Sequence, residues 1–164
     1  MSLYKELTPE NWLTEDHVLE SLRQIGGDFD QQRWATRVLR LALSPTVPQQ
    51  IRDLFGVARG ALLYGAFFYP MFTLGLEQLF RVAEASVDAR CKALGAPSRC
   101  KTYEKKLEWL REQGVLVPAD AQHWAILRQL RNSASHPEMQ LILTPGSVID
   151  WFERVVARVN ALYP

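Results

Sequence analysis

The chain has 164 residues, of which 48% are hydrophobic and 23% are charged. This length and composition are typical of one compact globular domain and exclude an intrinsically disordered protein. The formal net charge is only +1, which excludes a protein that coats nucleic acid by bulk electrostatics, so any contact with RNA must be local.

Residues 1–46 predict two short outer helices. The first is expected to begin at Thr8, with Pro9 as its first helical residue, and to end at Gly26-Gly27, because Thr is a favoured N-cap and Pro is favoured in the first turn. Its apolar face is expected to include Trp12, Leu13, Val18, Leu19, Leu22 and Ile25. The second helix is expected over Phe29–Leu43.

No signal peptide is expected. Acidic and basic residues interrupt the first 22 positions, where a signal peptide would have an apolar region.

Two long apolar helices are predicted next, over Gln49–Phe68 and Pro70–Leu94. The 17 residues from Gly60 to Leu76 carry no charge, which is the lower limit for a membrane span. Pro70 would interrupt a single spanning helix. We therefore expect buried core helices and no membrane segment.

The second long helix carries a polar stripe, at spacings that place its members on one face. Its residues are Glu77, Arg81, Glu84 and Asp88. One interpretation is a solvated face with ion pairs one turn apart, which contribute only tenths of a kcal/mol each. The other interpretation is functional, with Glu77 or Arg81 facing the motif described below.

The following segment contains both cysteines, Cys91 and Cys100. Neither has a second Cys or a His at zinc-binding spacing, so free thiols are expected, and a disulfide only in an oxidising compartment. A shorter helix is predicted over Thr102–Gln113. A basic cluster surrounds it, comprising Arg99, Lys101, Lys105, Lys106 and Arg111. Such clusters are usually solvated, and a contact with a phosphate backbone is the alternative.

The helix predicted over Pro118–Ser135 leads into the sequence Arg131-Asn132-Ser133-Ala134-Ser135-His136-Pro137. Pro137 disfavours the α conformation at His136, so the helix is expected to stop there. At a helix C-terminus the macrodipole favours a protonated imidazole, which suits a general acid or base. Arg128, Asn132 and His136 share one stripe of this helix, and Arg131 and Ser135 form the neighbouring stripe.

A last amphipathic helix is expected to begin at Thr144-Pro145. The chain is therefore predicted to be all-α. Trp34, Trp109, Trp124 and Trp151 fit the apolar faces of its helices, and His17 and His123 are interpreted as structural. No Gly-rich phosphate loop, HExxH motif or EF-hand spacing is present, so neither a cofactor nor a metal is predicted.

Three features together resemble HEPN-domain proteins. They are Tyr69-Pro70 opening a helix through Leu76-Glu77-Gln78-Leu79, the run Leu130–Pro137, and Thr144-Pro145 before the closing helix. The family's signature is an Arg, often followed by a polar residue such as Asn, with a His four to six positions after the Arg. Arg131, Asn132 and His136 match it, and the resemblance covers roughly Gln49–Tyr163. It implies a single domain over residues 1–164, with an up-and-down four-helix bundle at 47–164 preceded by the helices of residues 1–46.

The resemblance also implies a cytoplasmic homodimer in which two copies of the motif face each other and cleave RNA without metal. His136 would transfer protons, Arg131 would neutralise the phosphate, and Asn132 would orient the imidazole or bind the phosphate. Supporting roles are expected for Glu77, Arg81, Arg128 and Ser135. The alternative is a non-catalytic helical module for dimerisation or for binding a protein partner or small ligand.

Overall fold

The computed structural model describes residues 4–24, 28–117, 120, 123–124, 126–127 and 144–164. Throughout these residues the regular structure is helical, with no strand, which confirms the all-α prediction. The helices are α1 (His17–Gln24), α2 (Gln31–Leu39), α3 (Gln49–Tyr64), α4 (Pro70–Ala93), α5 (Tyr103–Glu112) and α7 (Pro145–Leu162).

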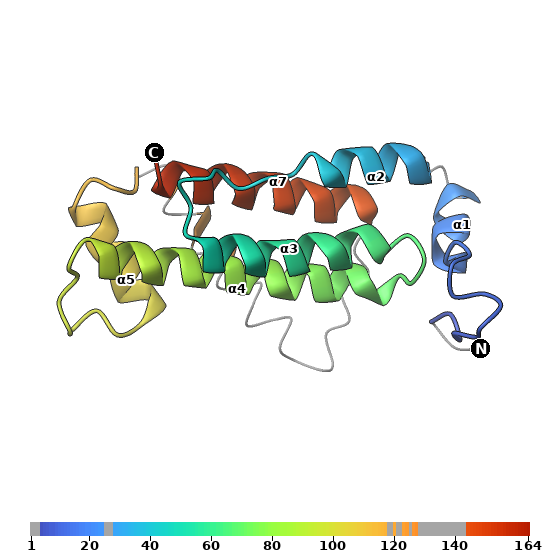
Figure 1. Ribbon diagram of the computed structural model, residues 1–164, viewed down its shortest axis with the longest axis horizontal. Helices are drawn as coiled ribbons and strands as arrows, with labels where there is room; N and C mark the ends of the chain where they lie inside the picture. Colours follow the sequence, from blue (N-terminus) through green and yellow to red (C-terminus); the bar gives the residue numbers. More distant parts are fainter. Residues whose placement is uncertain (1–3, 25–27, 118–119, 121–122, 125, 128–143) are drawn as a thin grey trace.

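The helices form a bundle organised around α4 (Figure 1). Helices α3 and α4 make an antiparallel hairpin, and α7 runs alongside it in the same direction as α4. Helix α5 packs at the C-terminal end of α4, whereas α1 lies at the opposite end, beside the turn between α3 and α4. Helix α2 packs against α3.

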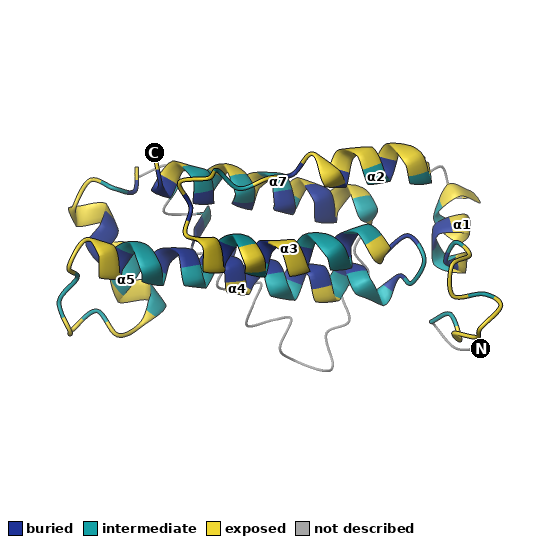
Figure 2. Ribbon diagram, in the orientation of Figure 1, coloured by how far each residue is buried: buried dark blue, intermediate teal, exposed yellow. Residues whose placement is uncertain are grey.

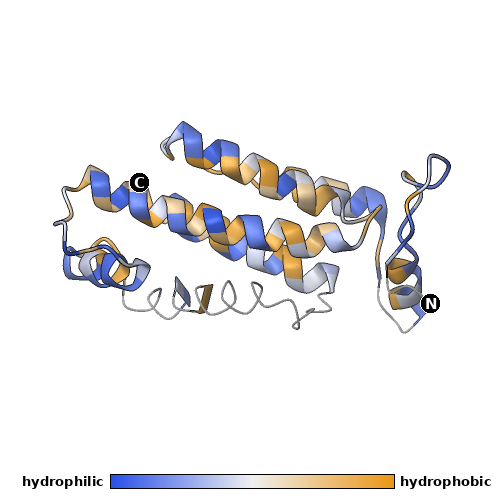
Figure 3. Cartoon of the chain, turned by 90° about the horizontal axis from the view of Figure 1, so that it is seen from below, coloured by the Kyte–Doolittle hydropathy of each residue, from blue (hydrophilic) through white to orange (hydrophobic). Residues whose placement is uncertain are grey.

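The core lies between the apolar faces of these helices (Figure 2). Hydrophobic and hydrophilic bands alternate along the helices, as the period of an amphipathic helix requires (Figure 3). Trp34 packs edge-on against Phe72 at 5.3 Å between ring centroids, and its indole N–H donates to the Leu62 carbonyl at 3.3 Å. Trp34, Trp109 and Trp124 are buried, as predicted, and Trp151 is half-buried.

The predicted start of the first helix is wrong. Residues 9–13 form turns and α1 begins only at His17, because side chains satisfy the backbone locally and compete with the helix. The Asn11 carboxamide accepts from Thr8 N–H at 2.9 Å and donates to the Glu6 carbonyl at 2.9 Å. Trp12 and Leu13, expected on the apolar face, are consequently 55% and 52% exposed.

Asp16 sets the position of α1. Its Oδ1 accepts from Val18 N–H at 3.0 Å, and its Oδ2 accepts from Tyr69 N–H at 2.8 Å. The Asp16 N–H in turn donates to the Ala66 carbonyl at 3.1 Å. This carboxylate is fully buried, so it fastens α1 to the end of the α3–α4 hairpin.

The other boundaries agree more closely with the sequence. Helix α2 begins at Gln31 instead of Phe29 because the Asp30 side chain caps it, accepting from Arg33 N–H at 2.6 Å, and it ends at Leu39 instead of Leu43. Helix α3 ends at Tyr64 instead of Phe68, while α4 and α5 end within one residue of the prediction. Thr102 and Thr144 both cap as N-cap residues, and Pro145 is the first residue of α7.

The uncharged run Gly60–Leu76 spans the turn between α3 and α4, so it forms parts of two helices. Within the described part of the chain, no helix combines the length and the apolar character that crossing a membrane requires.

Gly75 is expected to be required for the contact between α3 and α4. A Cβ at this position would lie 3.1 Å from Leu62 N and 3.3 Å from Ala58 O, both backbone atoms that cannot move independently. Gly75→Ala should therefore lower the free energy of unfolding by about 1–3 kcal/mol in urea denaturation. Gly146→Ala is the matched control, since a Cβ there meets no atom within 4 Å. It should leave stability unchanged or raise it by up to about 1 kcal/mol, and equal losses in both variants would contradict this role of Gly75.

Candidate functional site

The predicted catalytic residues lie outside the described residues. This applies to Arg131, Asn132 and His136, and to the supporting residues Arg128 and Ser135. Their grouping therefore stays a prediction. The described parts of the predicted site are the segment that leads into the motif and the polar stripe of α4.

The segment that leads into the motif is helical at each of its described positions from Asp120 to Leu127, in agreement with the predicted helix. Trp124 and Leu127 lie in the core at 0% and 3% exposure. The Asp120 carboxylate lies 3.6 Å from the Arg158 guanidinium of α7. Core packing on one side and an ion pair on the other thus hold this segment against the bundle.

Glu77 and Arg81 lie one turn apart on α4, where Glu77 is half-buried and Arg81 is exposed. Farther along the same stripe, the Asp88 carboxylate accepts from Lys106 and lies 2.6 Å from Lys92 Nζ. The hydrogen bond from Lys106, and next that from Lys92, hold the pKa of Asp88 below its usual range. The stripe is therefore an ion-pair surface at its Asp88 end, and an active role for Glu77 or Arg81 stays a prediction.

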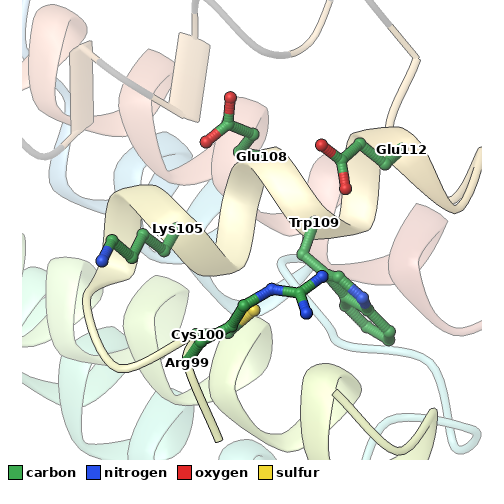
Figure 4. A pocket seen from close by; sticks show the side chains of 6 residues that line it. All are labelled: Arg99, Cys100, Lys105, Glu108, Trp109 and Glu112. Atoms are coloured by element: carbon green, nitrogen blue, oxygen red, sulfur yellow. The ribbon is translucent and has the colours of Figure 1, made fainter. Parts of the chain in front are cut away.

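The basic cluster around α5 is interleaved with acids. The hollow there has a volume of about 200 Å³ (Figure 4), and its lining residues are Arg99, Cys100, Lys105, Glu108, Trp109 and Glu112. The Arg99 side chain extends toward Trp109, while two carboxylates rise from α5. With two bases and two acids among its lining residues, this hollow carries no net positive charge. This balance favours a solvated surface over a contact with phosphates.

A larger groove lies between α2 and α7, with a volume of about 630 Å³. Arg37 is one of its lining residues, and its guanidinium donates to Glu153 at 2.8 and 2.9 Å and to Asp150 at 3.0 Å. These hydrogen bonds, with that to Glu153 first, raise the pKa of Arg37. These exposed ion pairs join α2 to α7 at the groove. The sequence did not predict this groove, because the two acids that pair with Arg37 lie over 110 positions away from it.

Both cysteines are free thiols, as predicted. Cys91 is buried, and its thiol contacts the Lys106 carbonyl at 3.7 Å. Burial raises the pKa of this thiol to about 11. Cys91 therefore stays protonated near neutral pH and is a core residue without nucleophilic character.

No protein-family model, curated protein or solved structure matches this chain. Its function is therefore inferred from its own residues, and from the resemblance of its motif to that of HEPN-domain proteins.

Proposed function

We propose that the protein is a metal-independent endoribonuclease of the HEPN type, which acts in the cytoplasm as a homodimer. The observation that carries the proposal is the run from Arg131 to Pro137, a signature motif with a proline directly after its imidazole. Two features support it. The chain is an all-helical bundle, and the segment before the motif packs into the core through Trp124 and Leu127.

The residue types suit cleavage of a ribose phosphodiester. The neutral His136 imidazole of one copy takes the proton of the ribose 2′-hydroxyl as the 2′-oxygen forms a bond to phosphorus. The bond from phosphorus to the 5′-oxygen breaks, and the partner's His136, as imidazolium, protonates that oxygen. Arg131 donates to the non-bridging oxygens, where negative charge develops. The products are a 2′,3′-cyclic phosphate and a 5′-hydroxyl end.

The remaining predicted residues have auxiliary roles in this proposal. Asn132 orients the imidazole or binds the phosphate through its amide. Arg128 and Arg81 add positive charge beside the RNA strand, which strengthens binding at low ionic strength. Glu77 and Ser135 position these groups by hydrogen bonding.

Cleavage of RNA in excess chelator tests the proposal. The full-length protein should cut total or transfer RNA in EDTA and leave 2′,3′-cyclic phosphate ends, which mass spectrometry identifies. His136→Ala should reduce the rate by about 100-fold or more, because general acid–base catalysis is lost. His17→Ala is the control, since His17 is an exposed residue of α1, and it should retain full activity. Equal RNA degradation by the wild type and His136→Ala would defeat the proposal.

A non-catalytic dimerisation module is the second candidate function. The observation in its favour is an exposed apolar surface on the α3–α4 hairpin, where Val57, Tyr64 and Leu74 are each at least half exposed. A well-folded protein that forms dimers and shows no ribonuclease activity would support this candidate.

A further inference from the structure

One face of the α3–α4 hairpin carries three exposed apolar side chains among half-buried ones. We call it the hairpin outer face and define it by Leu54, Val57, Ala61 and Tyr64 of α3 with Met71, Leu74 and Gln78 of α4. Val57, Tyr64 and Leu74 are 62%, 52% and 50% exposed. The colouring of Figure 2 shows exposed residues recurring along α3.

The contact between the two helices places these residues on one side. Gly75 lies against Ala58 and Leu62, and Val57 and Leu74 each directly precede one of these contact residues. One residue corresponds to about 100° of helix rotation. Because the helices are antiparallel, the same rotation in both turns Val57 and Leu74 toward the same side of the hairpin, away from the core.

The composition of this face is unusual for a surface in contact with water. A surface helix normally carries polar residues on its solvent side, yet no residue from Gly60 to Leu76 is charged on any side. Exposed apolar side chains that gather on one face in this way favour an interaction site.

Charges at one end of the face indicate which partner fits it. Asp53 lies one turn before Val57 on α3, and Arg81 lies two turns after Leu74 on α4. Counted from the contact at Gly75, both are roughly 10 Å along the hairpin toward the same end. Both side chains are exposed. The face thus carries an acid on one helix and a base on the other at the same level.

We propose that a second copy of this chain binds the hairpin outer face about a two-fold axis parallel to the hairpin. Such an axis lays α3 of one protomer on α4 of the other. Asp53 then faces the partner's Arg81, and the symmetry repeats this pair, as an isologous interface requires. Val57, Tyr64 and Leu74 fill the apolar centre. The inference deepens the proposed function and rests on its homodimer, because it names a surface through which two copies associate. It uses no residue of the Arg131–Pro137 motif, although Arg81 is also a supporting residue of the proposed site. The oligomeric state tests it separately from RNA cleavage.

Charge reversal tests this arrangement. Sedimentation equilibrium of the full chain should show a dimer, and Asp53→Arg and Arg81→Asp should each weaken it by about tenfold or more. The double variant Asp53→Arg/Arg81→Asp should restore most of the lost affinity, since the pairs re-form with opposite sign. Leu74→Glu, at the apolar centre, should also weaken the dimer. Leu39→Glu is the matched control, because Leu39 is 57% exposed on α2, and it should leave the dimer intact.

Far-UV circular dichroism of each variant confirms that the helical content is retained. A wild type that stays monomeric over the accessible concentration range would overturn the proposal. A dimer whose affinity is unchanged by all the hairpin substitutions would also overturn it. So would a double variant whose dimer affinity is no higher than that of the single charge reversals. Ribonuclease activity is measured separately with His136→Ala, so failure of the interface and failure of catalysis are distinguished.

Discussion

Replacing Trp124 with alanine is expected to lower the free energy of unfolding by about 3–5 kcal/mol. Trp124 is the largest of the fully buried side chains, at 0% exposure. Its removal takes away the burial of a large aromatic surface and leaves a cavity that the neighbouring helices can only partly fill. The substitution lies in the helical segment that leads into Arg131.

Chemical denaturation followed by far-UV circular dichroism measures this loss without depending on tryptophan fluorescence. Trp12→Ala is the control, since Trp12 is 55% exposed in the N-terminal turns. It should change the free energy of unfolding by less than about 0.5 kcal/mol. If the two variants unfolded at the same denaturant concentration, the central packing of Trp124 would be refuted.

The second large effect is expected at alkaline pH. Burial raises the pKa of Tyr163 from 10.0 to about 12 and that of Cys91 from 9.0 to about 11. Both groups hold their protons more tightly in the folded state, so the unfolded state releases protons at lower pH. Stability is therefore fully present below about pH 9 and is lost as pH rises toward 12. Each group contributes about 2–3 kcal/mol, which gives a total loss of roughly 5 kcal/mol.

The Tyr163 hydroxyl supplies the structural reason for its share. It donates to the Ser86 carbonyl of α4 at 2.7 Å, and ionisation would remove this donor and leave a buried charge. Tyr163→Phe should cost about 1 kcal/mol at pH 8, where the hydrogen bond is lost. The substitution should also remove the part of the loss in the free energy of unfolding at alkaline pH that comes from ionisation of Tyr163.

Urea denaturation at pH 8, 9, 10 and 11 of the wild type, Tyr163→Phe and Cys91→Ala separates the two contributions. The wild type should lose stability most steeply, and each variant should show a shallower decline. A wild-type free energy of unfolding that stays constant from pH 8 to pH 11 would show that these two side chains ionise equally in both states.

Local sequence signals predicted most of the helices, because caps and breakers act over a few residues. Thr102, Thr144 and Pro145 are examples, since each stands at the helix start that the sequence predicts. The start of α1 could not be found in this way. It depends on Asp16, whose carboxylate is held by Tyr69 N–H from 53 positions away, while an equally plausible Thr8-Pro9 start lies nearby in sequence.

The sequence by itself determined the helical class of the chain and the Arg131–His136 motif on which the proposed chemistry depends, because helical periodicity and motif spacing are properties of neighbouring residues. Only the tertiary structure decided which polar residues are already paired. Arg37 is paired with Glu153, and Asp88 with Lys106. It also decided that Val57, Tyr64 and Leu74 face solvent together. Ion pairs and shared surfaces join segments that are distant in sequence, and their geometry exists only once the helices are packed.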